Sequence, residues 1–473
     1  MKKKLFINGL WVEGEAYADL FAPYSEEKLA EIPQATANQV GAAINAAYEK
    51  RVVMAALTAF ERAMILENLV ELLKENQMKA AQIISLESAK PLKFSLGEVA
   101  RTIETYKFAA EEAKRLHGEM IPMDAAKTGA NRLAYTLREP IGVVAAITPF
   151  NFPLNLVAHK VGPAIAAGNT VVLKPASQTP LSSLFIAELL EKAGLPKGAL
   201  NVITGSGRLI GDQLVTSEKV SMVTFTGSPE VGIGIRNKAG MKKVALELGS
   251  NAGLIIDDEV NLDKIVSKCV TGAFSNQGQV CISVQRIYVH ENVLESFKVK
   301  FKEATEKLVI GDPMDEKTDV SALIARKEVL RAKEWIDEAV AGGGSLLTGG
   351  EIDNHILQPT ILSGVASNLT VSCQEVFAPI VIVNAIQNVD EGIAAINDSK
   401  YGLQAGIFTN DIATAMRASK QLEVGGVMIN DIPTYRVDQM PYGGVKQSGN
   451  AREGLKYTIE EMTEMKLVVW NQE

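Results

Sequence analysis

One cysteine of the chain lies in a setting that suits a nucleophile. Cys281 ends the polar, glycine-containing run 274–281, between a helical pattern upstream and a β-prone run that starts at Ile282. Little of a free thiol is ionised at neutral pH, yet its thiolate is the strongest nucleophile among the side chains, and an electrophilic carbonyl is its natural target. Taken alone, such a cysteine is more often a small buried hydrophobe, which is what we expect of Cys269 and Cys373.

Two further polar residues favour the chemical interpretation. Glu247 interrupts an apolar strand pattern that ends at Gly249, and burial would raise the pKa of its carboxyl enough to make it a usable general base. A lone glutamate there could equally be an ion-paired structural residue. Asn151, in the run 148–153, supplies a neutral amide donor. The combination of Cys281, Glu247 and Asn151 is much rarer than any one of them.

The elements that must position these residues form an alternating pattern. From residue 141 onward, β-prone runs are separated by helical segments, which is typical of a doubly wound parallel sheet. The runs are 142–147, 170–173, 200–203, 222–225 and 244–246. Ligands bind at the carboxyl ends of such strands. Those ends carry Asn151, Lys174, Gly205, Gly227 and Glu247. Before this region, 61–76 and 96–116 read as amphipathic helices, and 7–12 as a β-hairpin.

Length and composition limit the class of protein. A chain of 473 residues should form two or three domains. Its net charge of −8 argues against a nucleic-acid partner. The three cysteines include no CxxC pair and the four histidines no HExxH pair, so we expect no metal site. No histidine motif suggests a Ser-His-Asp triad or a papain-like Cys-His pair. No signal peptide is expected, and the longest apolar run, 141–150, is too short for a membrane helix. We therefore expect a cytoplasmic protein.

Along nearly its whole length the sequence resembles the aldehyde dehydrogenase superfamily. Within it, the runs 97–102 and 430–436 resemble the branch of lactaldehyde, non-phosphorylating glyceraldehyde-3-phosphate and phosphonoacetaldehyde dehydrogenases. The resemblance implies an α/β fold with a Rossmann-variant NAD(P)-binding domain (1–116 and 140–249), an α/β catalytic domain (250–447) and a small β oligomerisation flap (117–139 and 448–473). It also implies a homodimer or homotetramer.

The resemblance assigns catalytic roles to three residues. Cys281 would attack an aldehyde, Asn151 and the Cys281 backbone N–H would hold the oxyanion, and Glu247 would activate the water that hydrolyses the thioester. Lys160 could join a proton path with Glu247, although a solvated helix lysine is the expectation we prefer. A CoA-acylating dehydrogenase would not need Glu247, and an inactive binding homologue would not need all three residues.

The cofactor implied is NADP or NAD, although no GxGxxG fingerprint is present. Gly227 and Ser228 precede Pro229 at a helix start whose free N–H groups suit a pyrophosphate. By resemblance, the cofactor-binding residues are Phe150, Lys174, Ser177, Arg208, Gly227, Ser228, Leu248, Glu375 and Phe377. Many NAD-preferring relatives place a glutamate where Ser177 stands, so we expect NADP to be accepted.

The substrate expectation rests on Arg101, Asn155 and Arg436, of which the two arginines resemble those that grip an anionic tail. An arginine on a helix or loop is more often a solvated surface charge. Val280 stands where phosphate-binding members have an arginine. We therefore expect a small aldehyde that is hydroxylated or carries one anionic group, rather than glyceraldehyde 3-phosphate, with a succinate-semialdehyde-type substrate as the alternative. Ser250 and Ala378 each replace a glycine usual in the family.

Overall fold

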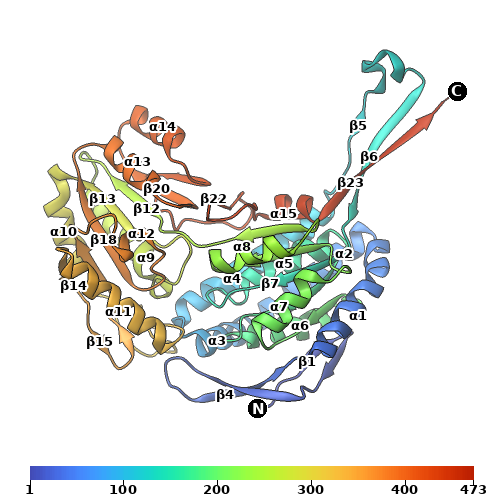
Figure 1. The fold of residues 1–473 in the computed structure, drawn as a ribbon, viewed down its shortest axis with the longest axis horizontal. Helices are drawn as coiled ribbons and strands as arrows, with labels where there is room; N and C mark the ends of the chain where they lie inside the picture. The colour runs from blue at the N-terminus through green and yellow to red at the C-terminus, as the bar shows by residue number, and fades with distance from the viewer. Residues whose placement is uncertain (473) are drawn as a thin grey trace.

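The computed structural model describes residues 1–472 and is built around two seven-stranded sheets (Figure 1). The first sheet has the order β11-β10-β7-β8-β9-β1-β2. Its parallel strands are β7 (Val143–Ile147), β8 (Thr170–Lys174), β9 (Leu200–Val202), β10 (Met222–Thr226) and β11 (Lys243–Glu247). The hairpin of β1 (Leu5–Ile7) and β2 (Leu10–Val12) adds antiparallel strands at one edge. The sequence prediction of these five parallel strands and of the hairpin is confirmed.

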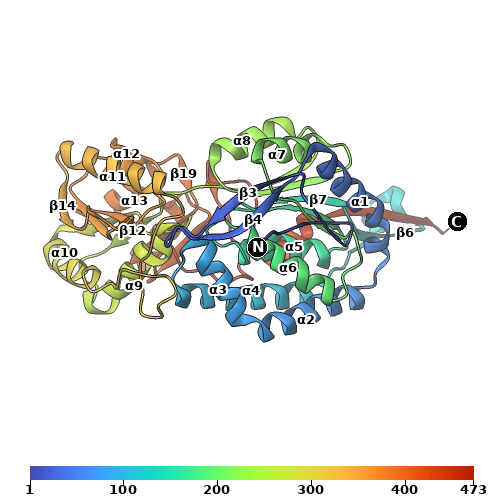
Figure 2. The ribbon, with the colours of Figure 1, turned by 90° about the horizontal axis from the view of Figure 1, so that it is seen from below.

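Helices cover both faces of the first sheet, as Figure 2 shows. Residues Val144 and Ala146 of β7 pack in one core with the helices of one face, and Val143 and Ala145 pack in a second core with those of the other. The first face carries α2 (Ala59–Glu75), α3 (Gln77–Ser88), α4 (Leu92–Ala113), α5 (Asn155–Ala166) and α6 (Pro180–Lys192). The other carries α1 (Ala37–Ala56), α7 (Gly207–Thr216) and α8 (Pro229–Lys238). This is the doubly wound arrangement that the strand and helix alternation predicted.

The second sheet has the order β14-β17-β18-β13-β12-β20-β21, and only the β14–β17 pair is antiparallel. Its strands are β12 (Gly253–Ile256), β13 (Arg286–His290), β14 (Ser345–Thr348), β17 (Thr360–Ser363), β18 (Ile380–Ile386), β20 (Gln404–Phe408) and β21 (Gly426–Ile429). Its helices are α9 (Leu262–Phe274), α10 (Glu291–Thr305), α11 (Arg326–Ala341), α12 (Thr370–Cys373), α13 (Val389–Asn397) and α14 (Ile412–Gln421).

The β-prone run that starts at Ile282 forms a strand only from Arg286 onward, so that prediction is confirmed for its second half. Ile282 and Val284 lie outside the strand, and the backbone N–H of Val284 donates to the carbonyl of Gly272 on α9. Cys281 therefore lies in a loop that folds back on the preceding helix.

A narrow three-stranded sheet projects from the body of the molecule (Figure 1). It consists of β5 (Met120–Ile121), β6 (Arg132–Pro140) and β23 (Thr463–Asn471), and β23 follows the short helix α15 (Leu455–Glu461). Strand β23 pairs with β6 along its whole length and leaves Leu467, Val469 and Trp470 exposed. Smaller pairs are β3 (Ala16–Phe21) with β4 (Lys28–Gln34), β15 (Ile352–Asp353) with β16 (Ile356–Leu357), and β19 (Tyr401–Gly402) with β22 (Val445–Lys446). Among residues 1–472, no helix has the length and apolar character needed to cross a bilayer.

Candidate active site

A left-handed turn delivers the cysteine. Asn276, Gln277 and Gly278 have φ angles of 50°, 56° and 69°. Gly278 is required at its position, because a Cβ atom there would lie 2.2 Å from the carbonyl oxygen of Ala378. The glycine-containing run before Cys281 thus forms a tight turn between α9 and the following loop.

The turn is joined directly to Asn151. The Asn151 amide nitrogen donates to the carbonyl oxygen of Gln279 at 3.0 Å. The backbone carbonyl of Asn151 accepts from the Asn276 side-chain amide at 3.2 Å and from the Lys90 ammonium at 2.7 Å. Asn151 is 4% exposed. Two of the three predicted catalytic residues therefore lie on loops that are hydrogen-bonded to each other.

Cys281 is half-buried, and its Sγ lies 2.7 Å from the hydroxyl of Tyr442. Desolvation raises the pKa of this thiol to about 12, while the Tyr442 hydrogen bond and the positive charge of Arg436 oppose the rise. The other two cysteines differ. Cys269 is buried on α9, as predicted, whereas Cys373 is only half-buried at the end of α12, so its expected full burial is wrong.

Glu247 ends strand β11 and is 4% exposed. Neither of its carboxylate oxygens has a hydrogen-bond partner among the described residues. Burial, and then the nearby charge of Glu453, raise the pKa of Glu247 well above its usual value, and Lys160 opposes this rise. The ion-paired structural interpretation of Glu247 does not hold, because no ion pair involves it within residues 1–472. The carboxyl remains available to a water molecule or substrate.

Lys160 is not a solvated helix lysine. It is 1% exposed, and its ammonium donates to the Thr224 hydroxyl at 3.1 Å and lies 3.5 Å from a carboxylate oxygen of Glu453. The preferred sequence interpretation is therefore wrong. Lys160 belongs to a buried group of charges next to Glu247.

Arg101 and Asn155 meet on the buried carboxylate of Asp438. Arg101 donates to both Asp438 oxygens, at 2.7 and 3.1 Å, while its side chain stays 32% exposed. The Asn155 amide donates at 3.2 Å, and His159 Nε2 lies 2.8 Å from the same carboxylate. The pKa of His159 is lowered, chiefly by burial. Since this histidine is neutral near pH 7, the charge of Asp438 is matched mainly by Arg101.

Arg436, with a side chain that is 7% exposed, is not a surface charge. One of its terminal nitrogens donates to Glu453 at 2.7 Å, and its guanidinium lies over the ring of Tyr442, 3.7 Å from the centroid. Its Nε is buried without a hydrogen-bond partner among the described residues. The alternative of a solvated surface arginine is therefore wrong at this position, and the Nε–H donor remains unused among the described residues.

The residues assigned to the nicotinamide end of a cofactor lie close together. The rings of Phe150 and Phe377 meet edge to face with centroids 5.8 Å apart. The Glu375 carboxylate accepts from the backbone N–H of Ser250 at 3.0 Å, and burial raises its pKa to about 7. A Cβ at Gly249 would lie 2.4 Å from the Glu375 carboxylate, so the glycine lets that carboxylate lie close to the loop after Glu247.

The residues assigned to the phosphates and adenosine lie at the carboxyl ends of the first sheet. Ser228 precedes α8 without forming a side-chain cap, and Pro229 follows it, which leaves first-turn N–H groups free for an anion. Leu248 packs against Gly232 of that helix. Lys174 is buried, its ammonium donates to the Pro175 carbonyl at 3.1 Å, and burial lowers its pKa to about 8.

Two of the predicted cofactor residues are exposed near this end of the sheet. Ser177 follows strand β8 and donates to the Gly205 carbonyl at 3.4 Å. Arg208 lies in the first turn of α7. Gly227 follows β10, and a Cβ there would collide with the Phe225 ring at 2.5 Å. The structure does not join Arg208 to Ser177 or Lys174 by any hydrogen bond within the described residues.

Sequence reasoning missed four residues of the site. They are Lys90, Asp438, Tyr442 and Glu453. Each is a single polar residue in a loop or at a helix boundary, where no periodic pattern distinguishes it. Only the glycine-rich run 441–444 could have indicated a functional loop around Tyr442.

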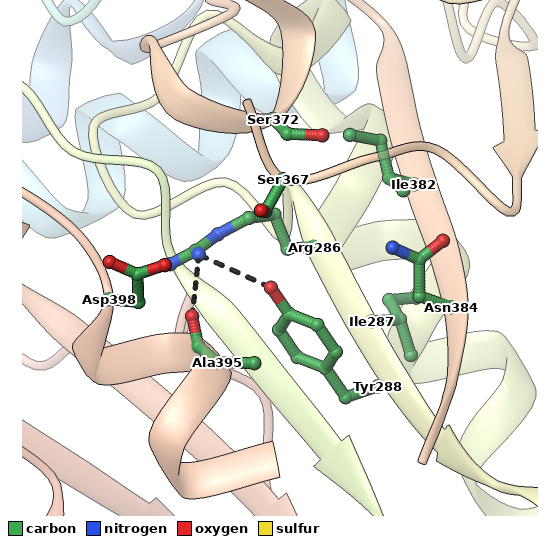
Figure 3. Close-up of a pocket in the computed structure, with 9 residues that line it drawn as sticks. All are labelled: Arg286, Ile287, Tyr288, Ser367, Ser372, Ile382, Asn384, Ala395 and Asp398. Carbon is green, nitrogen blue, oxygen red and sulfur yellow. Dashed lines mark hydrogen bonds between the residues drawn. The ribbon is translucent and has the colours of Figure 1, made fainter. Parts of the chain in front are cut away.

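A separate hollow of about 190 Å³ lies in the second sheet region and contains none of the predicted site residues (Figure 3). Its charged centre is Arg286, which donates to the Ala395 carbonyl at 3.0 Å and the Tyr288 hydroxyl at 3.3 Å. The guanidinium Nε also donates to the carbonyl of Asn251 at 2.9 Å. The guanidinium of Arg286 is thus hydrogen-bonded to its own chain on several sides. None of the predicted catalytic residues lines this hollow, so we do not assign it to the active site.

Comparisons with known proteins agree with this geometry. The model of the family described as "Aldehyde dehydrogenase family" matches residues 11–468. A 3-sulfolactaldehyde dehydrogenase of Priestia aryabhattai is 49% identical over 467 residues, which cover 99% of this chain and 98% of that protein. The crystal structure of aldehyde dehydrogenase 21 from Physcomitrella patens, in complex with the reaction product succinate, has a TM-score of 0.97 and 41% identity and covers 100% and 98% of the two chains.

A third comparison concerns a cofactor complex. The glyceraldehyde-3-phosphate dehydrogenase GapN of Methanocaldococcus jannaschii, complexed with NADP, matches with a TM-score of 0.93 and 41% identity, covering 97% of this chain and 100% of that one. The predicted fold class and family resemblance are confirmed by these matches.

Proposed function

The chain belongs to the aldehyde dehydrogenase family, and on that premise we propose that Cys281, Asn151 and Glu247 carry out its reaction. It is an NAD(P)-dependent oxidoreductase that converts a small aldehyde to its carboxylic acid. One observation carries the residue assignment. A buried carboxyl with two unpartnered oxygens lies near a half-buried thiol, close enough for the charge of Glu247 to act on the pKa of Cys281.

The first step joins sulfur to carbon. The Cys281 thiolate adds to the aldehyde carbonyl carbon, and the carbonyl electron pair moves to oxygen, giving a hemithioacetal oxyanion. The Asn151 amide nitrogen carries two hydrogens, of which the Gln279 carbonyl takes one. The second hydrogen and the Cys281 backbone N–H can then donate to the oxyanion.

The second step releases the acid. A bound NADP or NAD would supply an acceptor for the hydride of the former aldehyde carbon, and the acyl group would then remain on Cys281 as a thioester. Glu247 takes a proton from the water that attacks this thioester, and the sulfur departs as thiolate. Because a CoA-acylating enzyme would need no such base, the free oxygens of Glu247 support hydrolysis.

The chain's residues fit NADP or NAD. The uncapped first turn of α8 after Ser228 suits a pyrophosphate. Within residues 1–472 the buried ammonium of Lys174 has one hydrogen-bond partner, the Pro175 carbonyl, which leaves donors for ribose hydroxyls. Ser177 offers no carboxylate to repel a 2′-phosphate. We propose that NADP is accepted and that NAD is the alternative.

The free donors of the two arginines support an anionic substrate. Arg101 is paired with Asp438, but its side chain stays 32% exposed. Arg436 is paired with Glu453, and its buried Nε–H has no partner among the described residues. An anionic group on the aldehyde could accept hydrogen bonds from both guanidinium groups.

Two of the similar proteins, the 3-sulfolactaldehyde dehydrogenase and the succinate complex, narrow the class of aldehyde that we propose as substrate. A sulfolactaldehyde carries a hydroxyl and a sulfonate, and succinate carries a second carboxylate where its semialdehyde has the reacting carbon. Val280, buried beside Cys281, gives a bulky phosphate no additional cation. We propose a short hydroxylated aldehyde with a sulfonate or carboxylate tail, and a succinate-semialdehyde-type substrate as the alternative.

A substrate panel tests this proposal. Values of kcat/KM are measured for propanal, lactaldehyde, 3-sulfolactaldehyde, succinate semialdehyde and glyceraldehyde 3-phosphate, in the wild type and in Arg101→Ala and Arg436→Gln. Arg101→Ala should lose about 10- to 100-fold with the anionic aldehydes and much less with propanal. Arg436→Gln should lose activity with propanal as well, because Arg436 lowers the pKa of Cys281. Arg115→Ala, an exposed arginine beyond α4, is the control. Equal losses of Arg101→Ala with neutral and anionic aldehydes would contradict the anion-binding role.

A second experiment tests the nucleophile. Cys281→Ala should abolish aldehyde oxidation and leave the Kd for NADP unchanged, because the thiol serves only the chemical step. Cys373→Ala, another half-buried cysteine, should keep full activity. Oxidation by the Cys281→Ala protein would refute the assignment.

The domain roles and the assembly are also proposals. We propose that the first sheet, with residues 1–116 and 140–249, binds the cofactor, that 250–447 form the catalytic domain, and that 117–139 and 448–473 mediate a homodimer or homotetramer. The exposed apolar side chains of β23 favour pairing with a second copy. Sedimentation velocity of the full chain and of a Val469→Lys variant tests this. We further propose a cytoplasmic location, since a catalytic thiol needs a reducing compartment.

A further inference from the structure

Tyr442 is held against the catalytic cysteine by the fold. The two residues are 161 positions apart in the sequence, yet the tyrosine hydroxyl lies 2.7 Å from the Cys281 sulfur. The ring is 1% exposed and packs in a small apolar cluster with Val280, Ile282 and Leu403. The hydroxyl is therefore directed at the sulfur from within a packed environment.

Two contacts fix the orientation of the ring. The backbone of Tyr442 pairs with that of Glu453 through two hydrogen bonds, of 2.9 and 2.6 Å. The guanidinium of Arg436 lies 3.7 Å from the ring centroid and is itself held by the Glu453 carboxylate. A cation on the ring face draws electron density from the ring, which makes the phenol a stronger hydrogen-bond donor.

The direction of the hydrogen bond follows from the charges. Burial, and then the charge of Cys281, raise the pKa of Tyr442 well above its usual value, so the phenol keeps its proton at any working pH. Either group can donate while the thiol is neutral. Once the thiol is ionised, only the phenol has a proton to give, and a bond to an ionised acceptor is a strong one.

We propose that Tyr442 is a further catalytic residue, whose hydroxyl donates to the Cys281 thiolate and enlarges the ionised fraction of the thiol before attack. The proposal rests on Cys281 being the nucleophile. The thiol proton passes to solvent base, the sulfur lone pair forms the C–S bond, and the carbonyl electron pair moves to oxygen. Sulfur is then a neutral thioether, so the tyrosine acts on the reactant thiolate.

Other charged groups near the Cys281 sulfur also change the pKa of the thiol. Glu375 and Glu247 both raise the pKa of Cys281, in addition to desolvation, while Arg436 lowers it. Lowering a thiol pKa by one unit raises the thiolate fraction tenfold and reduces its nucleophilicity about threefold, a net gain of about threefold at pH values below the pKa. Tyr442 is the one hydrogen-bond donor that the structure, over its described residues, directs at this sulfur.

Alkylation of the full-length protein by iodoacetamide tests the proposal without the cofactor or an aldehyde. The reagent is neutral, so attraction of an anion to Arg436 does not enter. Tyr442→Phe should lower the rate constant for alkylation of Cys281, followed by mass spectrometry of the peptide that contains it, by about threefold or more at pH 8, and displace the rate profile to higher pH. Tyr106→Phe is the matched control, because Tyr106 is fully buried and its hydroxyl has no partner among the described residues.

Fluorinated tyrosines at position 442 separate a donor from a merely structural residue. Replacement by 3-fluorotyrosine and by 3,5-difluorotyrosine keeps the hydroxyl and makes it more acidic, so alkylation should accelerate along the series while the phenol stays protonated. A rate that does not change along the series, or a Tyr442→Phe protein that reacts as fast as the wild type, would overturn the proposal. If the Cys281→Ala protein still oxidises aldehydes, the nucleophile assignment fails instead. The fluorinated proteins also decide the matter if Tyr442→Phe does not fold.

Discussion

The ammonium of Lys90 donates a hydrogen bond to the backbone carbonyl of Asn151 at 2.7 Å. Lys90 is fully buried and forms an ion pair with Glu98, whose other oxygen accepts from the backbone N–H groups of Leu154 and Asn155. The loop that carries the proposed oxyanion donor is thus fixed at its backbone from both sides. Lys90 is a positioning residue in this arrangement, since it acts on the reaction only through Asn151.

Replacing Lys90 by methionine should therefore affect both stability and catalysis. The variant leaves Glu98 as an unpaired buried charge, which costs about 3–5 kcal/mol of unfolding free energy. It also frees the Asn151 loop, so kcat should fall while the Kd for NADP changes little. Urea denaturation and steady-state kinetics measure the two effects.

The double variant Lys90→Met, Glu98→Gln separates the effect on stability from the effect on catalysis. Removing the unpaired charge should restore much of the lost stability, whereas kcat should stay low because no ammonium holds the Asn151 carbonyl. If the double variant regained wild-type kcat, Lys90 would have no positioning role and its effect would be one of stability alone.

The acid limb of the pH profile should belong to Glu247. Because its pKa is raised, the carboxyl is protonated at pH values where an exposed glutamate is ionised, and only the ionised form can accept a proton from water. Turnover should rise as pH increases through this raised pKa. Glu247→Gln should lower kcat by about 10²- to 10⁴-fold, keep a burst of cofactor reduction from the first half-reaction, and lose the acid limb. An unchanged acid limb in that variant would assign the titration to another group.

Parts of this site were predictable because their residues interrupt a regular sequence pattern. Strand β11 carries three consecutive apolar residues, Val244 to Leu246, so the carboxylate at its end, Glu247, stands out in the sequence. Gly278 and its neighbours form a recognisable polar turn before Cys281. The strand after that turn was placed too early, because a β-prone composition cannot show that Val284 bonds back to α9.

The charged residues behind the site were not predictable from local pattern. Asp438 and Glu453 are single acidic residues in irregular segments, and their partners Arg101 and Arg436 look like surface charges in the sequence. Arg101 and Asp438, for example, are 337 residues apart in the sequence. Only the folded chain brings such residues together, and burial then decides their charge state.

Cofactor affinity should depend on pH through Lys174. Burial lowers the pKa of this ammonium to about 8, so its positive charge is present below that pH and lost above it. The charged form attracts the anionic cofactor and has one more N–H to donate to the ribose than the neutral amine. The Kd for NADP should therefore rise with pH above about 8, and Lys174→Met should bind more weakly with a flat profile. Fluorescence titration from pH 6 to pH 9.5 measures this, and a wild-type Kd that stays constant across the range would contradict it.

The choice between NADP and NAD should depend on the charge at position 177. Ser177 is exposed just after β8, which ends at Lys174, and a carboxylate there would repel a 2′-phosphate while accepting hydrogen bonds from ribose hydroxyls. Ser177→Glu should lower kcat/KM for NADP by about 10- to 100-fold and leave that for NAD equal or higher. Ser177→Gln, which has nearly the same size and no charge, should keep most of the NADP activity. The NADP defect of the glutamate variant should also shrink in high salt, because salt screens exposed charges. If the glutamine variant lost as much NADP activity as the glutamate variant, the effect would come from side-chain volume, and charge at this position would not set the cofactor preference.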